Sequence, residues 1–138
     1  MELYHASKQI VQYPEVRKAK YTKDFSWGFY CTNNIQQAIR WANREAGDPV
    51  INYYEYEPND SLKILKFPEM SDEWLDLIAQ CRNGKTHNYD IVEGPMADDT
   101  VWNYVNDFLT GRISRKQFWI NLFHSSDIQR WLRGLKYC

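Results

Sequence analysis

The sequence predicts an α+β fold, because strand-like and helix-like segments are interspersed without the regular alternation of a doubly wound sheet. β-Branched and aromatic residues mark short strands at residues 3–5, 28–32, 50–57, 62–67 and 89–93. Between them, apolar residues recur at helical spacing behind residues that cap helices. The chain has 138 residues and no internal repeat or linker, so we expect a single domain over residues 1–138.

Each predicted helix carries a start signal. Asn33 or Asn34 can cap a first helix, which runs to about Arg44 before the stop signal Gly47-Asp48-Pro49. Ser71 caps a second helix, which ends at Asn83-Gly84. A third helix follows the caps Asp98 or Asp99 and closes at Gly111, and the capping box at residues 114–117 predicts a fourth.

Two stretches are less regular. Residues 8–25 are polar, contain Pro14 and many basic side chains, and read as a long loop of the kind that often serves as a functional lid. The tail from Asp127 to Tyr137 fits a final strand or a helix, and its apolar spacing favours a helix.

Charge and cysteine content exclude several classes of protein. The net charge is −1 and the pI is about 6.3, so no electrostatic case exists for tight binding to nucleic acid or to a membrane surface. Three cysteines without close spacing favour reduced thiols and a cytoplasmic location. Residues 88–99 gather four carboxylates without a histidine at ligand spacing, so no metal is expected.

His5 is the first candidate binding residue. It ends a strand and precedes Ala6 and Ser7, which are small enough to leave room for a ligand. A neutral imidazole offers one donor and one acceptor, and this pair suits the diol of a ribose. The alternative is a structural histidine with a satisfied ring, which is the commoner role.

The second candidate is the predicted strand 28–32. Alternation places Gly28, Tyr30 and Thr32 on one face, and Gly28 lets a ligand or another backbone approach that face closely. Trp41 follows on the first helix, where its small neighbours could seat a flat ring against the indole. The alternative for Tyr30 is a core tyrosine whose hydroxyl finds a partner, and for Trp41 a tryptophan buried under the sheet is equally plausible. His87 and His124 look like surface residues.

These segments resemble a known class of enzyme. Leu3-Tyr4-His5-Ala6-Ser7 is similar to the first motif of ADP-ribosyltransferases of the diphtheria-toxin and poly-ADP-ribose-polymerase type, whose first signature residue is a histidine. Gly28-Phe29-Tyr30-Cys31-Thr32 resembles their second motif, and Trp41 stands at the offset of the aromatic that stacks on nicotinamide in the polymerases.

The closer resemblance is to DUF3990, a small bacterial family grouped with these transferases. Its pattern has a Leu-Tyr-His opening, an Asp-Phe-Gly-x-Gly-Phe-Tyr strand, a Trp-Ala helix and a Tyr-Asp-Ile-Val-x-Gly-Pro-x-Ala-Asp-Asp run, all traceable over residues 3–99. Ser26 replaces the first glycine of the strand pattern. The third signature position, an acidic residue or glutamine on a late strand, has only Asp127 and Gln129 as candidates.

The resemblance implies a split β-sheet core with flanking helices and transfer of ADP-ribose from NAD+ to a macromolecular acceptor. His5 would bond ribose hydroxyls, Tyr30 would support the nicotinamide ribose and Trp41 would stack on the nicotinamide. Asp127 or Gln129 would bond the ribose 2′-hydroxyl and orient the acceptor. The remaining residues implied in NAD+ binding are Ser7, Gly28 and Thr32.

Three alternatives to a simple transferase stay open. One is a catalytically silent module of the same fold that binds NAD+ or another nucleotide. Another is a protein-interaction role, such as a toxin held silent by an antitoxin protein. A third is an enzyme that modifies nucleic acid, with phosphate contacts from the basic residues of segment 17–23, although a charge run is more often a solvated face.

Overall fold

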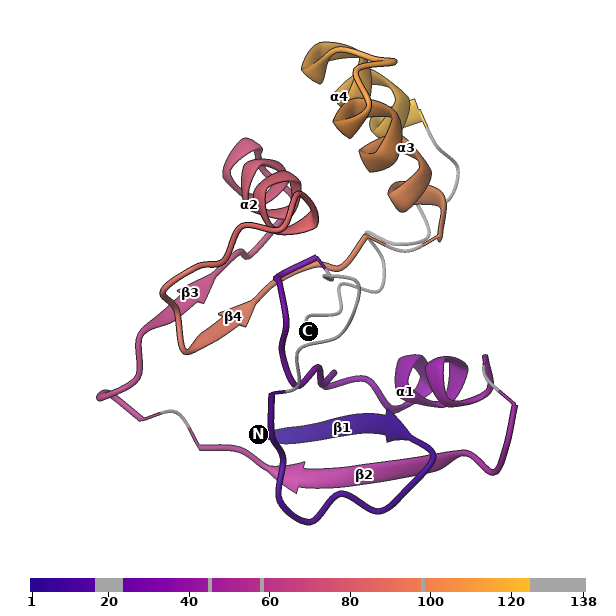
Figure 1. Ribbon diagram of the computed structural model, residues 1–138, viewed down its shortest axis with the longest axis vertical. Coiled ribbons are helices and arrows are strands. Elements are labelled where there is room, and N and C mark those ends of the chain that lie inside the picture. The colour runs from indigo at the N-terminus through magenta and orange to yellow at the C-terminus, as the bar shows by residue number, and fades with distance from the viewer. Residues whose placement is uncertain (17–23, 45, 58, 98, 125–138) are drawn as a thin grey trace.

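The computed structural model describes residues 1–16, 24–44, 46–57, 59–97 and 99–124. Within these ranges it contains four helices and two two-stranded sheets, which is consistent with the predicted α+β class. The elements form three tiers along the long axis (Figure 1), with one sheet at one end, the other sheet in the middle and the last two helices at the opposite end.

The first sheet carries the N-terminal motif. Strand β1 (Glu2–Ser7) pairs in antiparallel fashion with β2 (Val50–Glu55), which places His5 opposite Asn52. Helix α1 (Ile35–Ala42) packs against both strands. Its cap is Asn34, whose side chain accepts a hydrogen bond from the backbone N–H of Gln37, as the sequence predicts.

The predicted strand at residues 28–32 is reduced to one bridge. Backbone bonds of 2.7 and 2.9 Å join Tyr4 and Thr32, and no strand extends from this bridge within the segment. An antiparallel ladder would next pair Ala6 with Tyr30. The Tyr30 carbonyl instead accepts the His5 side chain, so this side-chain contact takes the place of the next rung.

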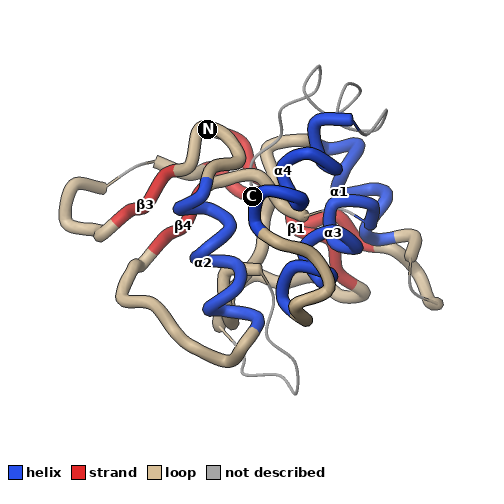
Figure 2. The backbone as a smooth tube through the Cα atoms, turned by 90° about the horizontal axis from the view of Figure 1, so that it is seen from above, coloured by secondary structure: helices blue, strands red, loops and turns tan. Residues whose placement is uncertain are grey.

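The second sheet is parallel. Strand β3 (Ile64–Lys66) pairs with β4 (Ile91–Glu93), and α2 (Asp72–Arg82) connects them. From above (Figure 2), α2 lies beside these two strands. Ser71 caps α2 by accepting from the N–H of Trp74. Helices α3 (Asp99–Leu109) and α4 (Arg115–His124) follow and pack on each other.

The main hydrophobic core lies among the last three helices. All four residues predicted as the apolar face of α2 are buried, and Trp74 also donates to the Pro95 carbonyl at 2.7 Å. Phe25 joins this core and thereby anchors the segment before residue 28 to the helices. The predicted tail element and the basic segment 17–23 lie outside the described residues.

Candidate functional site

The ends of β1, α1 and α2 border a cavity of about 690 Å³, which we call the basic cavity. Three of the residues singled out by sequence line it together: His5, Tyr30 and Trp41. Ser7 lines it as well. Four of the candidate residues therefore share one space, although up to 36 positions separate them in the sequence.

Two contacts fix the orientation of the His5 ring. Its Nδ1 lies 2.7 Å from the Tyr30 carbonyl oxygen, and its ring stacks on Phe29 with centroids 4.0 Å apart. A carbonyl oxygen only accepts, so Nδ1 carries the proton of the hydrogen bond. In the neutral ring, Nε2 is then the acceptor nitrogen, and a ligand hydroxyl is the kind of group that it can bind.

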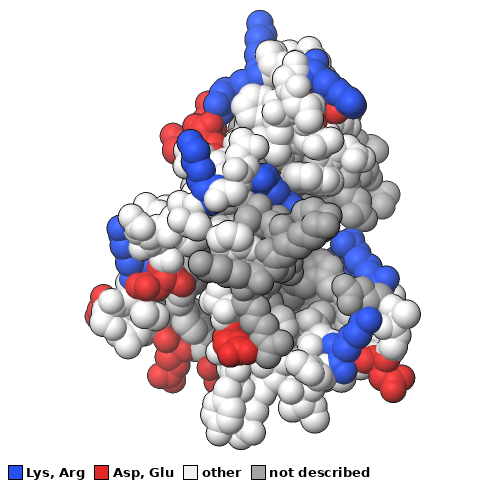
Figure 3. All heavy atoms as spheres, viewed as in Figure 1, with Lys and Arg blue, Asp and Glu red and all other residues white. Residues whose placement is uncertain are grey.

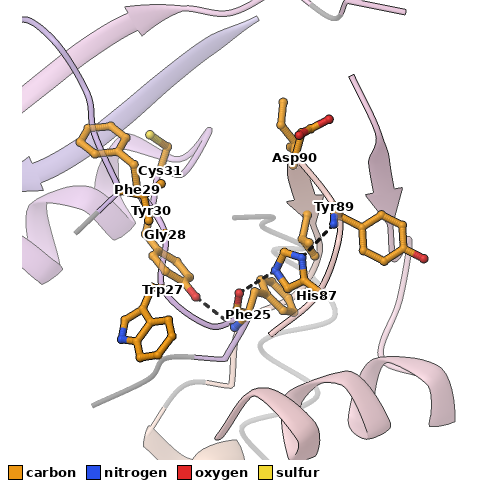
Figure 4. A pocket seen from close by; sticks show the side chains of 12 residues that line it. Phe25, Trp27, Gly28, Phe29, Tyr30, Cys31, His87, Tyr89 and Asp90 are labelled. Carbon is orange, nitrogen blue, oxygen red and sulfur yellow. Dashed lines mark hydrogen bonds between the residues drawn. The ribbon is translucent and has the colours of Figure 1, made fainter. Parts of the chain in front are cut away.

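The Tyr30 hydroxyl forms two hydrogen bonds within the loop that contains this residue. The phenol donates to the Ser26 carbonyl at 2.7 Å and accepts from the Phe25 N–H at 3.0 Å. The second of these bonds appears in Figure 4, a close view of a smaller cavity that Tyr30 also lines. Because the proton and one lone pair are engaged, the Tyr30 hydroxyl has little capacity left to bind a ligand.

Ser26 adopts a left-handed backbone conformation, with φ of +73°. A residue with a side chain adopts this region at a cost of about 1–2 kcal/mol, whereas glycine enters it freely. Ser26 is also the position at which this sequence departs from the glycine of the strand pattern that it resembles. The turn at Ser26 is what allows the Tyr30 hydroxyl to fold back onto residues 25 and 26.

Two predicted binding residues lie elsewhere. Thr32 is fully buried; its hydroxyl donates to Gln37 at 2.6 Å and accepts from the Asn34 N–H at 3.1 Å, so it stabilises the start of α1. Gly28 lines a smaller cavity of about 290 Å³ (Figure 4). Asp127 and Gln129 lie outside the described residues.

The basic cavity is also lined by three basic residues that the sequence analysis did not single out: Lys8, Arg44 and Arg82. Among the described residues that line it, none is an aspartate or glutamate. This contrasts with the face shown in Figure 3, where basic and acidic side chains are interspersed. The three cations come from separate segments, so only their charge could have drawn attention to them in the sequence.

Arg82 is held by a buried carboxylate. Its Nε and Nη2 donate to one oxygen of Asp24 at 3.0 and 2.5 Å, and the other Asp24 oxygen accepts from the N–H of Ala97 at 3.0 Å. Asp24 itself is 0% exposed. The guanidinium also lies 4.2 Å from the centre of the Trp102 ring. Asp24 thus joins the Asp-Phe motif to α2 and to the segment before α3.

His87 is half-buried, which corrects the prediction of a surface residue. Its Nε2 donates to the Phe25 carbonyl at 2.9 Å, and its Nδ1 accepts from the Tyr89 N–H at 3.2 Å. Figure 4 shows both bonds beside the smaller cavity. The neutral ring can form both hydrogen bonds. His87 therefore links residues 25–31 to the residues that precede β4.

Cys31 lines a third cavity of about 280 Å³, together with Leu3 and Tyr56. Burial raises the pKa of the Cys31 thiol to about 11, so the thiol stays protonated at neutral pH and is a poor nucleophile. The Tyr56 hydroxyl is buried without a hydrogen-bond partner among the described residues. Its pKa is raised, first by burial and then by the Glu93 carboxylate.

Two further properties concern metal binding and membrane spanning. Within the described ranges, no group of three or more histidine, cysteine or acidic side chains could hold a metal ion. In the same part of the chain, no helix has both the length and the apolar character needed to cross a membrane.

Comparison with known proteins places the chain in a family. Residues 1–132 match the family described as "Protein of unknown function (DUF3990)". The chain therefore belongs to the DUF3990 family, as its four motifs predicted. No curated protein and no solved structure matches the chain.

Proposed function

We propose that this protein is an NAD+-dependent ADP-ribosyltransferase with the split-sheet fold of that class, and that the basic cavity is its NAD+ site. The observation that carries the proposal is that the three signature residues line one cavity with three basic residues. The two separate sheets, with the 28–32 segment bridged to β1, also fit a split-sheet arrangement.

The size and charge of the cavity suit a dinucleotide. Small-molecule sites commonly enclose 300–1,000 Å³, and this cavity has about 690 Å³. NAD+ combines two flat rings, two riboses and a diphosphate. Rings at His5, Tyr30 and Trp41 complement the flat and sugar parts, and the cations complement the phosphates.

The reaction would break the bond between nicotinamide and C1′ of its ribose. The bonding electrons leave with nicotinamide, which becomes neutral, and positive charge develops on the ribose. A nucleophile of the acceptor then bonds C1′ and releases its proton. The site contributes by holding the reacting groups in position, with Nε2 of His5 accepting from a ribose hydroxyl and Trp41 stacking on nicotinamide.

The third role falls to Asp127 or Gln129. A carboxylate could stabilise the developing charge and take the proton of the acceptor, whereas a glutamine could only position the ribose. Replacing Asp127 by Asn and, separately, Gln129 by Ala identifies this residue. The essential variant loses nicotinamide release while NAD+ binding persists, and two fully active variants would exclude both residues.

One observation favours a second candidate function. The described residues that line the basic cavity include no carboxylate. A silent module that binds NAD+ or another nucleotide needs none, and it could act through a protein partner. A toxin of a toxin–antitoxin pair is a different case, because there the enzyme is active and would be inhibited by an antitoxin protein.

The deciding experiment combines binding, turnover and acceptor class. The protein is incubated with NAD+ labelled on the adenylate phosphate and a bacterial lysate, nicotinamide is quantified, and label is counted in protein and nucleic-acid fractions. Trp41→Leu should lower both NAD+ binding and turnover, with Trp119→Leu as the matched control outside the cavity. Binding without nicotinamide release would establish the silent module. Neither binding nor release would overturn both candidates.

A further inference from the structure

Arg82 occupies the last position of α2 and lines the basic cavity beside His5 and Trp41. Its side chain is 27% exposed, so the guanidinium is partly withdrawn from water. Charge interactions are stronger in such a setting than on an open surface. Lys8 and Arg44, which line the same cavity, are exposed at the level of the whole residue.

The Asp24 carboxylate fixes the edge of this guanidinium. Nε and Nη2 of Arg82 converge on one carboxylate oxygen, and these two bonds orient the guanidinium. The second carboxylate oxygen is held by the backbone of Ala97. Asp24 is completely buried, and each of its carboxylate oxygens is held by a hydrogen bond.

Trp102 fixes the plane of the guanidinium. The Arg82 Cζ lies 4.2 Å from the centre of the indole ring, a distance typical of a cation stacked on an aromatic face. One edge and one face of the planar group are thus constrained by two residues, Asp24 and Trp102. The rotamer entropy that a long side chain loses on binding a ligand has largely been lost already in folding.

We propose that Arg82 recognises the diphosphate of the bound dinucleotide, and that Asp24 is the positioning residue that holds the guanidinium for this contact. The inference rests on the proposed function and assigns a specificity-determining residue to the same site. A planar fork matches two phosphate oxygens at once, whereas Lys8 and Arg44 add attraction over a longer range. Ligands of this cavity are therefore selected for a diphosphate and not only for a base or a ribose.

A structural role alone makes a different prediction. If the Asp24–Arg82 pair served only to tie α2 to the loop, its loss would weaken all ligands of the cavity by similar factors. Recognition of phosphate instead requires that ADP-ribose and inorganic pyrophosphate lose affinity while adenosine, which lacks phosphate, does not. The ratio of affinities separates the two roles.

The experiment measures binding of ADP-ribose, pyrophosphate and adenosine by calorimetry at two salt concentrations. Because Arg82→Met alone would leave Asp24 buried and unpaired, the main variant is the double change Asp24→Asn with Arg82→Met. Arg82→Lys keeps the charge without the fork. Arg112→Met, which removes an arginine that is 74% exposed and lies outside the described cavities, is the matched control.

We expect the double variant to bind ADP-ribose and pyrophosphate about tenfold to a hundredfold more weakly, with adenosine and the control unchanged. Arg82→Lys should lose part of this affinity, and the salt dependence of binding should diminish in the double variant. Unchanged relative affinities in the double variant would overturn the inference, as would a wild-type protein that binds neither phosphate ligand. Pyrophosphate binding that depends on Arg82, without any nicotinamide release, would support the inference and count against the enzyme.

Discussion

Nδ1 of His5 lies 2.7 Å from the carbonyl oxygen of Tyr30, so the side chain of one sequence motif is bonded to the backbone of the other. This bond lies where the next backbone rung between the two segments would form. It orients the imidazole and leaves Nε2 as the acceptor nitrogen of the neutral ring.

Substitutions at His5 should separate the role of Nδ1, which bonds to the Tyr30 carbonyl, from the role of Nε2 as an acceptor for a ligand. Asparagine can present an N–H close to the position of Nδ1 but has no counterpart of Nε2. We expect His5→Asn to keep most of the stability and to lose NAD+ turnover, whereas His5→Ala loses turnover and about 1 kcal/mol of stability. Nicotinamide release and urea unfolding measure the two effects, and Tyr53→Phe on the exposed face of β2 is a control. Full turnover in His5→Asn would exclude a role for Nε2.

Replacing Asp24 by Asn should destabilise the protein by about 1–3 kcal/mol. Asp24 accepts from Arg82 on one oxygen and from Ala97 on the other, and an amide has only one oxygen. One of the partly buried donors then loses its bond to residue 24. The midpoint of urea unfolding measures the loss, and Asp107→Asn, at a partly exposed ion pair with Arg112, should change it little.

Replacing Ser26 by Gly should stabilise the protein by about 1 kcal/mol. The reason is the φ of +73°, which glycine adopts without steric cost. Ser26→Ala retains the strained backbone and is the matched control, for which no gain is expected. An equal rise in the unfolding midpoint of both variants would show that the side chain, and not the backbone, is responsible.

Stability should fall as pH rises above 9. Burial raises the pKa of Cys31 and Cys81 from 9.0 to about 11, so the unfolded chain loses thiol protons before the folded one does. The contribution of each thiol is complete below pH 9 and is lost between pH 9 and 11. Urea unfolding at several pH values tests this. The double variant Cys31→Ala, Cys81→Ala should show a weaker pH dependence, and an unchanged dependence would assign the effect to other groups.

Signals within a few residues predicted the helices well. Asn34, Ser71 and Ser114 each accept from a backbone N–H of the first turn that follows. Ile78 and its neighbours on α2 are buried as their spacing predicted. Such features depend on residues one to four positions apart, and a single sequence displays them directly.

Prediction from residues close together in the sequence fails for the 28–32 segment. Its composition is that of a strand, but Ser26 turns the chain, and the Tyr30 carbonyl bonds to His5. Strand character describes how side chains suit a pleated surface and does not say which backbone groups find a partner. The neighbouring β1 strand therefore determines how far this segment pairs.

The sequence by itself determined the family, the α+β class, the helix starts and the rings that meet at His5, Tyr30 and Trp41. Only the tertiary structure decided that three basic residues line the same cavity and that Asp24 holds Arg82. The contacts of Asp24 with Arg82 and Ala97 join residues 58 and 73 positions apart. Burial makes such contacts strong, and burial is a property of the packed chain that no short stretch of sequence contains.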